Sequence, residues 1–292
     1  MMFAAVTAIG AEGFGSAPGE KAAILMVHFG STFDDTRAVT IDALNADVKA
    51  AFPDVTVAEA FTSRIVMKRL AARGIVKLTP REALLRLAAD GYTHVFVQSS
   101  NIIDGIEMAN LRHEAAMMEP FFKEIRVGRP LLYSVGDCQE VSRIMADRYS
   151  GPLSDRKGAV VFVGHGSEGP ANAIYSQIDY MLTSAGHPGA HVATVEGYPT
   201  FDTVLARLKG AKTRKVTLVP FMFVAGDHAR NDIDGEWRGE LVKEGFEVTA
   251  VIEGLGQIPA IRNIFVEHIK EGLREKPLNA VELKSNFVRE NL

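Results

Sequence analysis

Short apolar runs rich in β-branched residues alternate along the chain with stretches of helical periodicity. The helical stretches include residues 35–51, 80–90 and 201–208. Short strands separated by helices are typical of βαβ units around a mostly parallel sheet. The pattern therefore predicts a doubly wound α/β fold. The predicted strands are residues 23–28, 56–61, 94–98, 159–163, 191–196, 215–220 and 247–252.

The two halves of the chain contain three pairs of similar segments in the same order. AILMVHFGS (23–31) is similar to AVVFVGHGS (159–167), and VAEAFTS is similar to the later TVEGYPT. The third pair, 93–110 and 214–231, has a smaller spacing because the first half carries an extra segment, AARGIVKLTP. Three pairs in order favour an ancient internal duplication. The alternative is that all doubly wound sheets share such patterns.

The length of 292 residues favours two lobes, since single cores stop growing near roughly 250 to 300 residues. We expect an N-terminal lobe at 22–129 and a second lobe at 130–257 that carries the candidate chemistry. Residues 258–292 are expected to form a C-terminal helix and tail. The helical pattern at 258–273 is compatible with packing on either lobe.

The N-terminal segment, residues 1–21, is apolar and then rich in small residues. Val6-Thr7-Ala8 matches a signal-peptidase site, but the basic region of a complete signal peptide is missing. Two readings stay open, a flexible arm and the remnant of an export signal. We expect a periplasmic protein, with the cytoplasm as the alternative. No apolar run reaches the roughly 18 residues of a membrane helix, so no transmembrane segment is expected.

Composition narrows the classes of partner and cofactor. Hydrophobic residues make up 47% of the chain and charged residues 23%, as in ordinary globular proteins. The net charge of −4 argues against nucleic acid as a partner. With Cys138 as the one cysteine, a metal must be held by histidine and carboxylate. The sequence has no phosphate-binding GxxxxGK[ST] loop and no GxGxxG after the first strand, so no nucleotide cofactor is expected.

Three reactive side chains follow the carboxyl ends of predicted strands in the second half: His165, Glu196 and His228. In open α/β sheets ligands bind beyond these ends, so the three can converge. Two histidines and a carboxylate suit a divalent ion such as cobalt, nickel, iron or zinc. Each also has an ordinary reading: a loop cap for His165, an ion pair for Glu196 and a solvated loop residue for His228. Asp227, Arg230 and Asp232 are candidates for supporting contacts rather than ligands.

The first half offers Glu59 and Glu107 at duplicated positions, and His28 one residue out of register with His165. These side chains would form the opposite side of a site between two lobes.

Four segments, ILMVHFGS, VGHGS, TVEGYPTFD and PFMFVAGDHARNDI, together resemble the anaerobic sirohydrochlorin cobaltochelatases, a family of class II tetrapyrrole chelatases. The similarity runs from Ala22 to Ile269. It implies two Rossmann-like lobes related by pseudo-twofold symmetry, with the tetrapyrrole between them. It also implies insertion of Co2+, with Fe2+ or Ni2+ as further substrate metals, into sirohydrochlorin or a related tetrapyrrole without ATP.

The resemblance implies that His165 and His228 bind the metal and that Glu196 is the accompanying carboxylate. We expect His165 and Glu196 to take part in catalysis, with His28 and Glu107 as further catalytic candidates, because pyrrole protons need acceptors. Residues expected to bind the tetrapyrrole are Arg230 and Ser167, and Arg64 and Arg112 are further partners for its carboxylates.

Two positions depart from the family's usual pattern. His28 stands where the family usually has a small residue. Ser100-Asn101 stands where it usually has leucine and histidine, which puts a haem-binding role of that region in doubt here.

Two other functions use the same residues. A carrier would bind one equivalent of tetrapyrrole or metal and would not turn over. A metal-dependent hydrolase would need an open coordination position and an ester or amide substrate, although the sequence has no GxSxG elbow. The sequence leaves open whether the protein forms a homo-oligomer.

Overall fold

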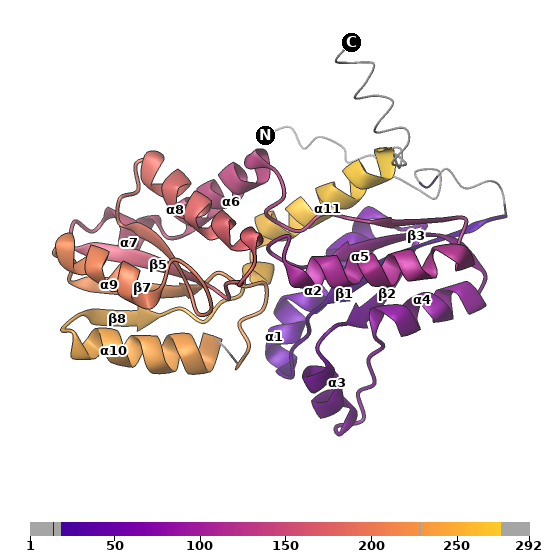
Figure 1. Ribbon diagram of the computed structural model, residues 1–292, viewed down its shortest axis with the longest axis horizontal. Helices are drawn as coiled ribbons and strands as arrows, with labels where there is room; N and C mark the ends of the chain where they lie inside the picture. The colour runs from indigo at the N-terminus through magenta and orange to yellow at the C-terminus, as the bar shows by residue number, and fades with distance from the viewer. Residues whose placement is uncertain (1–13, 15–18, 228, 276–292) are drawn as a thin grey trace, which may run out of the picture.

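The computed structural model describes residue 14 and residues 19–227 and 229–275 of the chain (Figure 1). These residues form two lobes, each built on a four-stranded parallel sheet. The first sheet has the order β2-β1-β3-β4 and the second the order β6-β5-β7-β8, so the strand order is the same in both. The prediction of two doubly wound α/β lobes is confirmed. The strands are β1 (Lys21–His28), β2 (Thr56–Phe61), β3 (Tyr92–Ser99), β4 (Glu124–Val127), β5 (Gly158–Gly164), β6 (Ala190–Thr194), β7 (Lys215–Pro220) and β8 (Glu247–Ala250).

Helices flank both sheets, and side-chain caps begin several of them. Thr79 and Ser134 each form a capping box with an acidic residue three positions later, and Thr200 accepts a hydrogen bond from Thr203 N. The first-lobe helices are α1 (Asp34–Val39), α2 (Ile41–Ala51), α3 (Arg64–Ala71), α4 (Pro80–Ala89), α5 (Ile106–Met118) and the short η2 (Glu119–Phe121). The later helices are α6 (Val135–Arg148), α7 (Ser150–Ser154), η3 (Pro170–Asn172), α8 (Ala173–Ser184), α9 (Phe201–Gly210), the π-helix η4 (Ala229–Trp237), α10 (Arg238–Lys243), η5 (Leu255–Gln257) and α11 (Pro259–Arg274).

Three predicted elements differ from the observed ones. The predicted helix at 35–51 is two helices, because Thr40 has φ −121° and ψ −76° and interrupts the hydrogen-bonding pattern. The predicted strand at 191–196 ends at Thr194, although Val195 N still donates to the carbonyl of Gly164 on β5 (3.0 Å). Strand β4 was not predicted, since all four of its residues are half-buried and it lacks a run of apolar side chains.

Helices α6 and α11 contact each other and pack on different lobes. Helix α6 contacts α8 and α7 in the second lobe, whereas α11 contacts α2 and β3 in the first. Arg126 on β4 donates to the carbonyl oxygens of Gly272, Leu273 and Glu275 at the end of α11. The ring of Phe96 occupies the space that a Cβ at Gly272 would need. These contacts join the lobes.

A shared apolar core supports this junction. One buried cluster extends from Ile24 and Met26 on β1 to Val160 and Phe162 on β5. Burial of this surface away from water is the main stabilising contribution to such a junction. None of the helices in the described ranges is long and apolar enough to cross a membrane.

Candidate metal site

His165 and Glu196 lie side by side at the carboxyl ends of β5 and β6. The backbone N–H of Glu196 donates to the carbonyl of His165 (2.7 Å), and Val195 N donates to the carbonyl of Gly164 (3.0 Å). His165 Nδ1 is 4.0 Å from Glu196 Oε2, and the two side chains are 46% and 65% exposed. Both side chains therefore extend from loops that are hydrogen-bonded to each other, and both are accessible to an ion.

Gly166 allows this close approach of the two loops. Its φ is +93°, and a Cβ would fall well inside 3.0 Å of the Glu196 carbonyl oxygen and carbon. A side chain at this position would push the Glu196 loop away. The VGHGS motif is thus explained locally, because only glycine fits directly after His165.

Asn172 joins the same two loops, a role that no sequence pattern predicted. Its Oδ1 accepts from Ser167 N (3.0 Å), and its Nδ2 donates to the carbonyl of Tyr198 (2.6 Å). Ser167, predicted to bind the tetrapyrrole, is half-buried, and its Oγ accepts from Gly169 N (3.3 Å). An asparagine at the start of a helix is an ordinary sequence feature, so no pattern pointed to it.

The third predicted ligand, His228, lies outside the described residues. Its neighbours contact the first lobe: Asp227 Oδ2 is 2.9 Å from Arg69 Nη1 on α3. Arg230 places its guanidinium 4.4 Å over the ring of Phe33, and its Nη2 is 3.7 Å from Asp35 Oδ2. Within the described ranges, which omit position 228, no group of three or more His, Cys, Asp or Glu side chains is arranged to hold a metal ion.

His28 is buried in the first lobe and is hydrogen-bonded on both ring nitrogens. Nε2 is 3.0 Å from Asn45 Oδ1 and Nδ1 is 2.9 Å from Ser100 Oγ. Because Asn45 Nδ2 donates to Glu59 Oε2 (2.8 Å), Asn45 Oδ1 must accept from His28 Nε2–H, and Nδ1 accepts from the Ser100 hydroxyl. Burial lowers the pKa of the His28 ring, which favours this neutral form.

The His28 ring also stacks on Phe223, which follows β7 in the second lobe, at 6.2 Å between centroids and 20° between planes. With an exposure of 1%, the ring is placed to position neighbours rather than to touch a substrate. Its catalytic role stays a prediction. The two departures from the family pattern, His28 and Ser100, are partners in one hydrogen bond.

The remaining predicted residues lie near the carboxyl end of the first sheet. Glu107 is exposed in the first turn of α5, directly after the loop that follows β3. Arg112 is held by both carboxylate oxygens of Asp104 (2.6 and 2.8 Å), so its guanidinium is engaged within its own lobe.

The two-lobed parallel-sheet fold is also found in solved structures of chelatases. The solved structure of SirB from Bacillus subtilis with Fe3+ has this fold, with a TM-score of 0.62 at 18% identity over 87% of this chain and 96% of that chain. SirB from Bacillus subtilis subspecies spizizenii in complex with cobalt gives the same TM-score, 0.62, at 17% identity over 88% and 97%.

The particular family follows from the sequence. The model described as Cobalt chelatase (CbiK) matches residues 22–274, and the chain belongs to this family. The sirohydrochlorin cobaltochelatase of Salmonella typhimurium is 39% identical over 258 residues, 87% of this chain and 97% of the relative. The sirohydrochlorin cobaltochelatase CbiKC of Nitratidesulfovibrio vulgaris is 32% identical over 86% and 90%. The predicted family is confirmed.

Proposed function

We propose that this protein is a sirohydrochlorin cobaltochelatase, which inserts Co2+ into the tetrapyrrole without a nucleotide. Its family and its relatives at 39% and 32% identity support this function over the carrier reading. The observation that carries the proposal for the site is the pair formed by His165 and Glu196, with Nδ1 and Oε2 4.0 Å apart on hydrogen-bonded loops. Imidazole and carboxylate are suitable ligands for a divalent first-row metal ion.

In this mechanism Co2+ is a substrate that His165, Glu196 and His228 hold and then release. Protons compete with metal ions for imidazole nitrogen, so cobalt affinity falls on acidification. Insertion exchanges two pyrrole N–H protons for the dication, so the overall charge balances. The exposed carboxylate of Glu196 accepts these protons and passes them to water. Other divalent ions that suit the same ligands, Fe2+ and Ni2+, compete according to supply and geometry.

The tetrapyrrole binds at the strand ends, where large apolar side chains are exposed. Phe29 (51%), Ile65 (67%) and Ile106 (72%) follow β1, β2 and β3 in the first lobe, and Tyr198 (57%) follows β6 in the second. Exposed apolar groups gathered on one side of a protein commonly mark a binding surface. These four suit the apolar faces of a macrocycle held near His165.

The proposal is tested by anaerobic titration with Co2+ followed by absorbance assays with sirohydrochlorin. His165→Ala and Glu196→Gln are compared with His113→Ala, which removes an exposed histidine from α5. The first two variants are expected to lose at least tenfold in cobalt affinity and most of the insertion rate, whereas His113→Ala retains both. Equal cobalt affinity in all three variants would place the metal elsewhere.

For location, we propose the periplasm, with the cytoplasm as the alternative. The support is the composition of residues 1–21, including Val6-Thr7-Ala8, which lies outside the described residues. Fractionation of the source cells with an antibody against the protein tests this: recovery with cytoplasmic markers would exclude the periplasm.

A further inference from the structure

Helix α3 is an addition to the first lobe that the second lobe does not share. Between β2 and α4 the first lobe contains residues 62–79, including α3, whereas the second lobe runs from β6 to α9 through residues 195–200. In Figure 1 α3 projects from the lower side of the first lobe. It begins directly after β2, so its first turn lies at the carboxyl end of the sheet, where the proposed site is.

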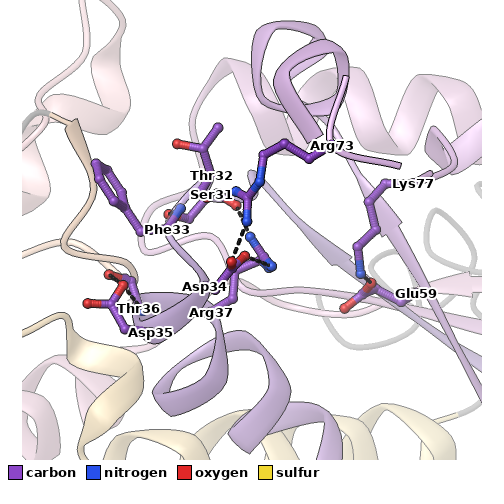
Figure 2. Close-up of polar contacts among 10 residues, drawn as sticks. All are labelled: Ser31, Thr32, Phe33, Asp34, Asp35, Thr36, Arg37, Glu59, Arg73 and Lys77. Carbon is purple, nitrogen blue, oxygen red and sulfur yellow. Dashed lines mark hydrogen bonds and ion pairs between the residues drawn. The ribbon is translucent and has the colours of Figure 1, made fainter. Parts of the chain in front are cut away.

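The segment 64–77, RIVMKRLAARGIVK, carries five cations and no acid. Three of the five are engaged. Arg69 pairs with Asp227 of the second lobe at 2.9 Å. Figure 2 shows the other two: Arg73 is directed at Asp34 and also donates to the carbonyl of Thr32 (2.6 Å), and Lys77 is directed at Glu59.

Arg64 and Lys68, which we call the α3 basic pair, are the remaining two. Both are exposed, and across the described ranges neither side chain has a hydrogen bond or ion pair. Glu82 is an acid whose pKa the charge of Arg64 affects: hydrogen bonds from Thr79 chiefly lower this pKa, and Arg64 contributes less. Two charges of the α3 basic pair are therefore available to a ligand.

Local electrostatics oppose this arrangement. Arg64 is the first residue of α3, where the positive end of the helix dipole disfavours a cation, and the first turn contains no acidic residue. Arg64 and Lys68 are also four residues apart, so like charges face each other along the helix. A local rule broken without compensation inside the protein is typical of a binding site.

We propose that the α3 basic pair binds the peripheral carboxylates of the tetrapyrrole and thereby sets the specificity for a polycarboxylate substrate. This inference rests on the proposed function. The ion pair between Arg69 and Asp227 ties α3 to the second-lobe loop one residue before His228. A macrocycle centred on the metal ligands thus brings its peripheral carboxylates towards α3. Ile65, exposed between the two cations, provides apolar contact for the ring edge.

The test is an absorbance titration of sirohydrochlorin without metal, together with KM and kcat for cobalt insertion. The variant is Arg64→Gln/Lys68→Gln. Its matched control is Lys49→Gln/Lys243→Gln, which removes two cations from the last turns of α2 and α10. These turns precede β2 and β8, so both lysines lie at the amino ends of strands, opposite the proposed site.

We expect Kd and KM for sirohydrochlorin to rise about threefold for each charge, as for exposed ion pairs, and about tenfold for both. The kcat value and cobalt affinity are expected to stay within twofold, and the control variant to match the wild type. Higher ionic strength should raise the Kd of the wild type for sirohydrochlorin towards that of the double variant, because salt screens exposed charges.

A double variant with the Kd and KM of the control would overturn the inference, as would a loss of kcat at unchanged Kd. Failure of the proposed function is distinguishable, since it appears as absent turnover in the wild type. In that case the metal-free Kd still tests the α3 basic pair.

Discussion

Replacing Gly166 with alanine tests the contact between the loops that carry His165 and Glu196. A Cβ at Gly166 would overlap the Glu196 carbonyl, and φ is +93°, a conformation that costs an alanine about 1 kcal/mol. Displacing the packed backbone adds roughly 1–3 kcal/mol, so we expect Gly166→Ala to lower the free energy of unfolding by about 2–4 kcal/mol. Moving Glu196 away from His165 should also weaken cobalt binding at least tenfold.

Gly186 provides a matched control. Its φ is +94°, but a Cβ there would meet nothing within 4 Å. Gly186→Ala therefore isolates the backbone strain and should cost about 1 kcal/mol without changing cobalt affinity. Urea denaturation and cobalt titration of both variants measure the difference. Equal losses of stability, or a Gly166→Ala protein with wild-type cobalt affinity, would refute the importance of the loop contact.

Three further predictions concern stability and positioning. Burial raises the pKa of Asp137, but hydrogen bonds from His268 and Ser134 outweigh it and hold the pKa at about 2. Because the pKa of Asp137 is lowered in the folded state, its ionised carboxylate stabilises the protein above pH 3.8, and this contribution is lost as the pH falls towards 2. Asp137→Asn should therefore lower the free energy of unfolding by about 2 kcal/mol at pH 6 and hardly at all near pH 2, as measured by urea denaturation. Asn172→Ala removes two hydrogen bonds between the site loops and should lower stability by about 1–3 kcal/mol and cobalt affinity with it, as cobalt titration would reveal; unchanged affinity would show that the backbone bonds suffice. His28→Ala leaves a buried cavity beside Phe223 and should cost about 3 kcal/mol in thermal unfolding while kcat falls less than tenfold; a far larger loss of kcat in a stable protein would favour direct catalysis.

The fold was largely predictable because buried parallel strands are continuous apolar runs. Strand β5, AVVFVG after its first glycine, is such a run and is fully buried. Strand β4, EIRV, lies at a sheet edge with every residue half-buried, so neither a run nor strict alternation marked it. The interruption at Thr40 also has no local signal, because residues 35–51 keep an amphipathic pattern across it.

The candidate site was predictable only in part. His165 and Glu196 were predicted from the rule that ligands bind at strand ends, and the structure places them 4.0 Å apart. The internal duplication singled out His28, which is nevertheless buried, with Asn45 on α2 hydrogen-bonded to its Nε2. Such a partner depends on how α2 packs against β1, which a sequence pattern does not reveal.

Catalytic insertion of cobalt is tested most directly by a count of the product formed per protein molecule. Sirohydrochlorin and Co2+ in large excess are followed anaerobically by absorbance, with the uncatalysed rate subtracted. We expect many equivalents of cobalt-sirohydrochlorin per protein and a near-background rate for His165→Ala. One equivalent followed by no further reaction would contradict it and identify a carrier.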